Sequence, residues 1–256
     1  MTLPFDDRGL TLGDGLFETL LAEGGTLVAF DDHAARLERS CLALGLPAPA
    51  RAVLRRKADA ALAGAGLREV RSAVRLTWTA GSGGRGLERP MTLAPRLFAT
   101  AAAAPRPATP ARLVTVDIRR NDTSPASRMK TLSYLDNILA RRDALARGGD
   151  EALMLNTRGE VAGAAAANIF WLKDDRVFTP ALDCGVLAGI ARGEVLAEAA
   201  TVGLVVEEVR AGPDALADTQ GVFLTNSLMG LRAVSTIDGR PQQPTQVTTL
   251  LMRGRR

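Results

Sequence analysis

Lys130, in the segment RMKTLSYLDN, is the residue whose type and setting best suit chemistry. A lysine amine can form a Schiff base with a carbonyl compound, and burial lowers the pKa of a lysine so that it can act as a base. The chain has only three lysines, at positions 57, 130 and 173, and arginine carries the rest of its positive charge. The single tyrosine, Tyr134, follows four residues later, where its phenol could hydrogen-bond a cofactor oxygen. A solvated surface lysine and an ordinary tyrosine of an amphipathic helix are the alternative interpretations.

Other positions could bind an anion such as a phosphate. The segment GIAR, at residues 189–192, opens a predicted helix, and the N–H groups and the dipole at a helix start favour a bound anion. Thr225, Asn226 and Ser227 follow the apolar strand VFL, a common position for hydroxyl ligands. Arg36 could neutralise a phosphate from an early helix. An ordinary glycine turn, a polar strand-to-helix turn and a surface arginine are the respective alternatives.

The glycine-rich segment GSGGRG, at residues 81–86, is a weak phosphate-loop signal. It lacks the lysine and the hydroxyl that such loops place on a phosphate, and a flexible hairpin is the alternative. Arg85 within this segment could still meet a substrate carboxylate. His33 is expected to be a packing or hydrogen-bonding residue at a helix start rather than a catalyst.

The scarce residue types exclude several other kinds of site. The 256 residues include one His and two Cys, too few for a His/Cys metal site or a disulfide framework. The net charge is +4 and aromatic residues make up 4%, so nucleic-acid binding is weakly supported and an anionic small molecule fits equally well. No apolar run approaches the ~20 residues of a membrane helix. We therefore expect a soluble cytoplasmic protein with no metal, no nucleic-acid partner and no membrane segment.

The elements that must position these residues fall on either side of a proline-rich stretch, AAAAPRPATP, at residues 101–110. Proline disfavours both helix and strand, so we expect a small N-terminal α/β domain over residues 1–105 and a larger C-terminal domain over residues 106–256. In the first domain, hydrophobic periodicity predicts strands at 26–30, 70–79 and 92–100. It predicts helices at 31–45, with Asp31 and Asp32 as caps, and at 51–62.

The second domain is predicted to be a mixture of helices and strands that do not strictly alternate. Strands are expected at 112–118, 152–155, 169–172, 177–179, 204–209 and 221–225. Helices are expected at 135–147 and 189–200, with another near the C-terminus. Leu135, Ile138 and Leu139 recur on one side of the first of these helices.

The order of the motifs along the chain is more specific than any one of them. GDGLFETL (13–20), DDHAARL (31–37) and AGSGGRGL (80–87) are followed by KTLSYLDN (130–137), AANIFWL (166–172), TPALDCGVLAGIAR (179–192) and FLTNSLMGLRAV (223–234). Over nearly the whole chain this series resembles the class IV aminotransferase family, whose members bind pyridoxal 5'-phosphate (PLP). GDGLFET, SGGRG and LTNSLMG most resemble the branch containing 4-amino-4-deoxychorismate lyase. Branched-chain and D-amino-acid aminotransferases share the scaffold.

This resemblance implies an α/β (α+β) fold of two domains, of the D-amino-acid aminotransferase type, with PLP in the interdomain cleft. It implies that Lys130 is covalently linked to PLP and later moves protons, and that Tyr134 lies near the phenolic oxygen of the cofactor. Members of the family are generally homodimers, and a loop of the neighbouring subunit often closes the pocket.

The same resemblance assigns a phosphate site. Arg36, in the H-x-x-R-L pattern, is expected to bind the PLP phosphate together with the backbone at Ile190 and Ala191 and the hydroxyl of Ser227. Many relatives have threonine where Ala191 stands, so a hydroxyl donor is lost here while a backbone N–H donor remains.

One position departs from the family pattern. The family usually has V-T-E where this chain has Val161, Ala162 and Gly163, so Gly163 stands in place of the glutamate that pairs with the pyridine nitrogen. That carboxylate keeps the nitrogen protonated, which makes PLP a stronger electron sink. Its loss is expected to weaken transamination more than a lyase reaction that forms an aromatic ring. Glu160 could substitute only if the loop took another course.

The resemblance therefore implies a lyase that converts 4-amino-4-deoxychorismate to 4-aminobenzoate and pyruvate, for folate precursor synthesis. The substrate amine would displace Lys130 from PLP, and Lys130 would then remove the ring C4 proton as pyruvate leaves. Arg85, and less directly Arg75 or Arg232, could hold the substrate carboxylates as bidentate donors. A class IV aminotransferase for branched-chain or D-amino acids and a degenerate, non-catalytic protein of the same fold are the alternatives.

Overall fold

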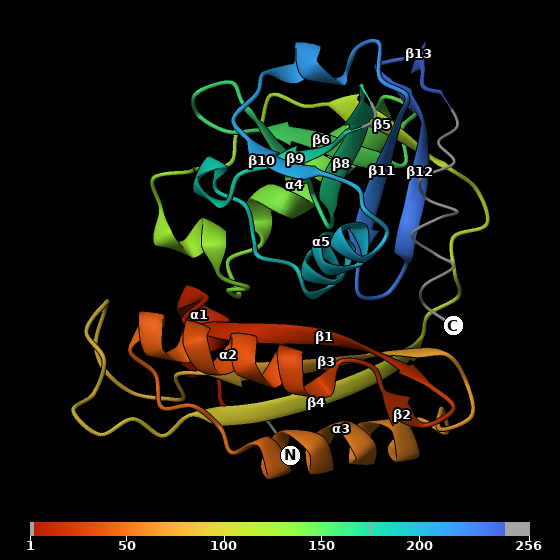
Figure 1. The fold of residues 1–256 in the computed structure, drawn as a ribbon. Coiled ribbons are helices and arrows are strands. Elements are labelled where there is room, and N and C mark those ends of the chain that lie inside the picture. Colours follow the sequence, from red (N-terminus) through yellow and green to blue (C-terminus); the bar gives the residue numbers. More distant parts are fainter. Residues whose placement is uncertain (1–2, 175, 244–256) are drawn as a thin grey trace. The chain divides into compact units, whose positions relative to one another are not determined.

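The structure, a computed structural model that describes residues 3–174 and 176–243, divides into two compact units that are described separately (Figure 1). The first unit comprises Met1–Pro105 and Met129–Ser133, and the second comprises Arg106–Arg128 and Tyr134–Arg256. The five residues around Lys130 thus pack with the first unit, although the chain on both sides of them belongs to the second. From the sequence, all residues after 105 were expected in the second domain, and the packing of residues 129–133 with the first unit was not predicted.

The first unit is built on a four-stranded antiparallel sheet. Its strand order is β2-β1-β3-β4, with β1 at Gly15–Glu23, β2 at Thr26–Leu27, β3 at Ser72–Thr79 and β4 at Arg96–Ala103. The short helix α1 (Arg8–Leu12) precedes β1, and the long helices α2 (Phe30–Leu44) and α3 (Arg51–Gly64) cover one face of the sheet (Figure 1).

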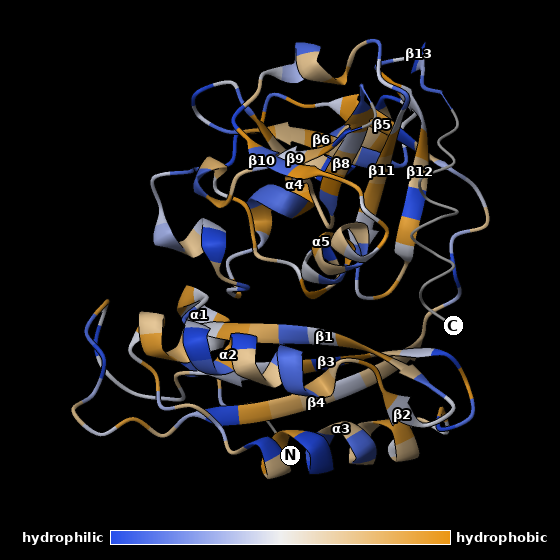
Figure 2. Ribbon diagram, in the orientation of Figure 1, coloured by the Kyte–Doolittle hydropathy of each residue, from blue (hydrophilic) through white to orange (hydrophobic). Residues whose placement is uncertain are grey.

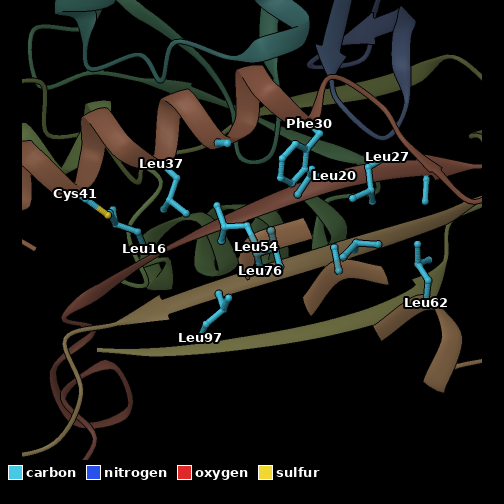
Figure 3. Packing of buried hydrophobic residues seen from close by; sticks show 14 of the residues in the cluster. Leu16, Leu20, Leu27, Phe30, Leu37, Cys41, Leu54, Leu62, Leu76 and Leu97 are labelled. Atoms are coloured by element: carbon cyan, nitrogen blue, oxygen red, sulfur yellow. The ribbon is translucent and has the colours of Figure 1, made fainter. Parts of the chain in front are cut away.

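Alternation along the strands explains how α2 and α3 attach. Leu16 and Leu20 on β1 point to the helices, where they pack with Leu37 of α2 and Leu54 of α3 (Figure 3), as the period of two in a strand requires. Both helices carry hydrophilic and hydrophobic residues (Figure 2). The buried residues of α3, Leu54, Ala58 and Leu62, are four positions apart, so this helix has one apolar face for the core.

The second unit is built on a nine-stranded mixed sheet. The order of its strands is β10-β9-β8-β11-β12-β5-β6-β7, and β13 pairs with β12. The strands are β5 (Ala111–Thr115), β6 (Glu151–Leu155), β7 (Val161–Ala164), β8 (Asn168–Lys173), β9 (Arg176–Pro180), β10 (Val206–Val209), β11 (Gly221–Asn226), β12 (Gly230–Ile237) and β13 (Arg240–Pro241). Three short 3-10 helices lie at Pro125–Arg128, Leu182–Cys184 and Pro213–Leu216.

Within the described residues, the second unit has three apolar cores. Its sheet curls around the first, and one helix packs against the sheet at each of the other two. Ile169 and Trp171 of β8 point into the enclosed core. Phe170, the residue between them, stacks on Phe223 of β11, with ring centroids 5.1 Å apart, beneath α5 (Ile190–Thr201). Helix α4 (Leu135–Ala146) packs on β5 and β6 through small residues. The expected mixed α/β fold is therefore confirmed.

Several predicted elements differ in detail from the structure. The first long helix begins at Phe30, so Asp31 and Asp32 lie in its first turn and do not cap it. Strand β4 continues to Ala103, and the first alanines of the predicted linker are therefore strand residues. Helix α4 buries Ala140 and Ala144.

Leu135 and Ile138, two of the three apolar residues noted on α4, are 64% and 62% exposed, so they do not form its buried face. Strands β1, β7 and β12 and the two-residue β13 were not predicted. The predicted C-terminal helix lies outside the described residues. No helix in the described part of the chain is long and apolar enough to cross a membrane.

Candidate active site

Lys130 lies on a short stretch of backbone that extends the sheet of the first unit. Strand β2 pairs only with Ala22 and Glu23, which leaves that edge of β1 open around Leu16. The segment from Lys130 to Leu132 fills it: Phe17 N donates to Lys130 O at 2.8 Å, and Leu132 N donates to Gly15 O at 3.0 Å. Two backbone hydrogen bonds thus fix the main chain directly after the lysine side chain, on both sides of Thr131.

The Lys130 side chain lies over an aromatic ring that it shares with Arg75. Lys130 Nζ is 4.3 Å from the centroid of the Phe17 ring, and Arg75 Cζ is 3.6 Å from the same centroid. A cation over an aromatic ring gains about 0.5–2 kcal/mol, more when it is desolvated, and Phe17 is buried. The structure therefore brings one of the three predicted substrate arginines, Arg75, close to the predicted nucleophile.

A buried ion pair lies on the helix-covered face of β1. Arg36 donates from Nε and Nη2 to the two oxygens of Glu18, at 2.8 and 2.6 Å, and His33 Nδ1 lies 2.7 Å from Glu18 Oε2. Burial acts to raise the pKa of Glu18, but the hydrogen bonds and charges of Arg36 and His33 outweigh it, and the pKa lies below its usual value. Because a carboxylate only accepts, His33 Nδ1 is the donor.

The periods of α2 and β1 explain why these three side chains meet. His33 and Arg36 are three residues apart on α2 and so share one helix face, while Glu18 alternates with Leu16 and Leu20 on β1. The expected role of His33, a hydrogen-bonding residue at a helix start, is confirmed. Glu18 was missed, although a lone charge within the apolar run GLFETLL was a usable signal.

In the second unit, helix α5 begins at Ile190 with no side chain capping its first turn. Its N-cap, Gly189, makes no such bond, so the amides of Ile190 and Ala191 lack the usual side-chain acceptor. A Cβ at Gly189 would lie 2.1 Å from Asn168 Oδ1, and Asn168 Nδ2 donates to Leu187 O at 3.0 Å. Asn168 therefore braces the loop before the helix, and only glycine fits there.

The turn between β11 and β12 carries the predicted hydroxyl ligand. Asn226 Oδ1 accepts from the amides of Leu228 and Met229 at 3.0 and 2.9 Å, which fixes the partly buried Ser227 at the tip of this turn. Thr225, two residues earlier, is fully buried, and its hydroxyl has no hydrogen-bond partner in the described part of the chain. A buried hydroxyl of this kind has its donor and its acceptor available for a further group.

Gly163 lies on β7, opposite Met154 of β6. Its φ is +127°, a conformation that side-chain-bearing residues rarely adopt, and a Cβ there would lie 3.1 Å from Ala167 O. Glu160 does not replace the absent carboxylate, because it accepts from Asn156 Nδ2 at 2.6 Å and Arg158 Nη2 at 2.8 Å. Both bonds lower the pKa of Glu160.

Tyr134 directly precedes α4 in the second unit and interacts electrostatically with Arg120. The side chain of Arg120 lies beside the β6–β7 pair, where Nη2 is 3.4 Å from Met154 Sδ and donates to Ala164 O at 3.3 Å. Its Nε is buried and has no partner among the described residues. Sequence reasoning missed Arg120, which looks like any other arginine of an arginine-rich chain.

The glycine-rich segment at 81–86 is a folded loop around a buried arginine. Arg8 donates from Nη1 to Glu88 O at 2.9 Å and from Nη2 to Leu87 O at 3.0 Å, and its Nε pairs with Asp14. Carbonyl oxygens therefore converge on a cation here, and the phosphate-loop interpretation is not supported. Arg85 is exposed on this loop.

The Arg232 side chain hydrogen-bonds the backbone of the segment that follows β4. It donates from Nε to Thr109 O at 2.9 Å and from Nη2 to Pro110 O at 3.4 Å, and it lies 3.8 Å from Asp150. These bonds attach the predicted linker to β12. We therefore do not include Arg232 in the substrate site.

A family model and two sequence relatives match this chain over most of its length. A family model for amino-transferase class IV matches residues 15–237. Aminodeoxychorismate lyase of Vibrio harveyi is 28% identical over 241 residues, which are 92% of this chain and 87% of that protein. A Methanocaldococcus jannaschii protein, provisionally named a branched-chain-amino-acid aminotransferase, is 31% identical over 240 residues, 91% of this chain and 82% of the relative.

Solved structures agree with the sequence relatives. A crystal structure from Legionella pneumophila, whose name of 4-amino-4-deoxychorismate lyase is likewise provisional, superposes with a TM-score of 0.90 and 26% identity, covering 100% of this chain and 95% of that one. Enzymes of this class depend on PLP, and PLP is the cofactor.

The residues of each unit fit parts of this cofactor. In the first unit, Lys130 offers an amine and Arg36 a guanidinium oriented by Glu18. In the second, the uncapped start of α5 and the partnerless hydroxyl of Thr225 suit a phosphate. Polar groups that suit the aldehyde and the phosphate of PLP are therefore present, whereas the carboxylate for its ring nitrogen is not. In the described part of the chain, the start of α5 has no side-chain cap and the Thr225 hydroxyl has no partner.

Proposed function

Because the chain belongs to the class IV aminotransferase family, we propose that it is a PLP-dependent lyase that converts 4-amino-4-deoxychorismate to 4-aminobenzoate and pyruvate. Lys130 carries the cofactor. Arg36, the amides of Ile190 and Ala191, and the hydroxyl of Ser227 hold its phosphate. When bound, PLP supplies an electron sink for negative charge that develops on the substrate carbon bearing the amine.

Lys130 supplies the proton transfers. Its amine takes the proton from ring C4 of the substrate, the bond between C3 and the enolpyruvyl oxygen breaks, and the same amine returns a proton to the departing group, which leaves as pyruvate. Atoms balance without an oxidant or a second substrate. Proton transfer by a positioned group contributes about 10²–10⁴-fold, and the backbone bonds that fix residues 130–132 to β1 provide that positioning.

Arg75 is the first choice for a substrate carboxylate. It lies over the same Phe17 ring as Lys130, so a carboxylate held by its guanidinium stays near the amine. Arg85 is a second choice, on an exposed loop.

The observation that favours a lyase over a transaminase is Gly163. The position expected to carry the carboxylate for the pyridine nitrogen has no side chain and a φ of +127°. Without that carboxylate the ring accepts electrons less readily, and a transaminase depends on the ring throughout. The lyase reaction gains driving force because its product is a benzene ring.

An aminotransferase remains a second candidate because the Methanocaldococcus jannaschii relative is 31% identical. One experiment separates the two. The purified protein is incubated with 4-amino-4-deoxychorismate alone, and pyruvate and 4-aminobenzoate are measured. A parallel incubation contains branched-chain or D-amino acids with 2-oxoglutarate, and new oxo acids are measured. Equimolar pyruvate and 4-aminobenzoate support the lyase, whereas oxo acids alone would refute it.

Lys130→Ala is the companion variant. Borohydride reduction followed by peptide mass analysis should find PLP on Lys130 in the native protein and none in the variant. Lys173→Ala, which alters a partly buried lysine at the end of β8, is the matched control and should retain both label and activity. A degenerate, non-catalytic protein would carry the label and form no product.

A further inference from the structure

Arg120 is a charged group that no part of the proposed reaction uses. Its Nη2 contacts Met154 Sδ and the carbonyl of Ala164, and its buried Nε has no partner in the described part of the chain. No carboxylate accepts a hydrogen bond from it among the described residues. A partly buried cation with so few partners, and with a buried N–H that has none, is costly unless a further acceptor reaches it.

The surroundings of Arg120 supply little compensation. Burial is the largest influence and lowers its pKa, while the Tyr134 phenol and the Asp136 carboxylate act in the opposite direction. Asp136 is exposed in the first turn of α4, where water screens its charge. The loop on another side contributes Gly185, whose Cβ would lie 3.3 Å from Arg120 Cγ, and so brings no polar side chain.

The contacts of Arg120 place it beside Gly163. Met154 pairs with Gly163 across the β6–β7 ladder, and Ala164 is the next residue along β7. The guanidinium therefore lies next to the position at which the family resemblance expects a carboxylate for the pyridine nitrogen. The φ of +127° at Gly163 disfavours any residue that could bring such a carboxylate back.

We propose that in this chain Arg120, in place of a carboxylate, borders the pyridine nitrogen of PLP and donates a hydrogen bond to it, so that the nitrogen stays unprotonated. The inference rests on the proposed PLP site. A guanidinium has only donors, and a neutral pyridine nitrogen is an acceptor, so the two match. A protonated nitrogen would place two cations together, which is unfavourable.

A neutral ring nitrogen also limits which substrates this protein can convert. A neutral pyridine is a weaker electron sink than a pyridinium, so substrates whose reaction has its own driving force are favoured. An elimination that creates an aromatic ring has such a driving force, and a simple amino acid has none.

The test is the protonation state of the ring nitrogen, read by nitrogen NMR of the native holoenzyme reconstituted with PLP labelled with ¹⁵N in the ring. The native protein should show the shift of an unprotonated pyridine over the pH range in which it is folded. In Arg120→Met the nitrogen should become protonatable, with a midpoint raised by about 1–3 pH units, the usual effect of removing a neighbouring like charge. Arg119→Met, at the exposed adjacent arginine, is the control and should match the native protein.

Two results would overturn the inference. One is a protonated nitrogen in the native holoenzyme. This measurement does not depend on the folding of any variant. The other is an unprotonated nitrogen that Arg120→Met and Arg120→Lys both leave unchanged. Failure of the proposed function is distinguished by mass analysis, because a chain that carries no PLP on Lys130 after borohydride reduction fails at that earlier step.

Discussion

Replacing Glu18 with glutamine tests whether this carboxylate holds Arg36 in place. Glu18 accepts two hydrogen bonds from Arg36 and one from His33, and the Glu18 and Arg36 side chains are 2% and 8% exposed. Removing one charge of a buried pair costs about 3–5 kcal/mol, because the other charge stays buried without compensation. An amide can still accept a bond but cannot neutralise the guanidinium. We therefore expect Glu18→Gln to lose about 3 kcal/mol of unfolding free energy.

The matched control is Glu38→Gln on α2, the helix that carries Arg36. Glu38 accepts the same pair of bonds, from Nε and Nη2 of Arg51, but both side chains are well exposed, and water screens such a pair. Urea unfolding of the apoprotein in a Trp171→Phe background leaves Trp78 as the only tryptophan, so its fluorescence follows the first unit. Equal losses in the two variants would refute the assigned role of Glu18.

The same pair predicts a pH dependence. The pKa of Glu18 is depressed in the folded protein from the ordinary value of 4.5. Its stabilising contribution is therefore complete above about pH 4.5 and is lost as the pH falls through the lower folded-state pKa. The difference in unfolding free energy between native protein and Glu18→Gln should shrink in that acidic range. A difference that stays constant with pH would show that the ionised carboxylate is not responsible.

Three other perturbations test separate parts of the structure. Thr225→Val removes the buried hydroxyl that lacks a partner among the described residues. The apoprotein should keep its stability, and the dissociation constant for PLP should rise about tenfold because one hydrogen bond to a charged group is lost. An unchanged dissociation constant would place this hydroxyl outside the phosphate site. Arg8→Met removes the cation around which the loop at 81–88 folds, and trypsin should then cleave after Arg85 much faster than in the native protein; equal cleavage rates would contradict this. Gly163→Ala should cost about 1–3 kcal/mol of unfolding free energy because of its positive φ, measured by urea denaturation, and a neutral outcome would show that β7 can relax.

The sequence was informative where a local pattern decides the structure. Helices α3 and α5 lie within two residues of their predicted ranges, because each has one apolar face and a clear start. Strand β1 was missed for the opposite reason. Phe17 and Leu21 on one face are buried as well as Leu16 and Leu20 on the other, so the strand lacks the alternation of polar and apolar residues that sequence reasoning depends on.

The candidate site divides in a similar way. The order of the motifs singled out Lys130, Arg36 and the start of α5, since each lies in a recognisable segment. Arg8 and Arg120 could not be recognised, because the burial of an arginine depends on the packing of distant segments. The carbonyls that surround Arg8 come from residues about eighty positions later in the chain, and no local pattern encodes that contact.

The contrast between Arg36 and Arg120 also explains how one chain can bind a phosphate and still favour a neutral ring. Glu18 neutralises and orients Arg36 before any ligand arrives, so this guanidinium contributes direction to a phosphate site more than net charge. Among the described residues no carboxylate accepts a hydrogen bond from Arg120, and its buried Nε has no partner, so its charge acts on whatever lies beside β7. A carboxylate at Gly163 would cancel that charge and permit a protonated ring; its absence leaves the charge in force. The residue that is missing and the residue that is uncompensated are therefore parts of one electrostatic arrangement, and altering Arg120 should change the chemistry of the ring more than its attachment to Lys130.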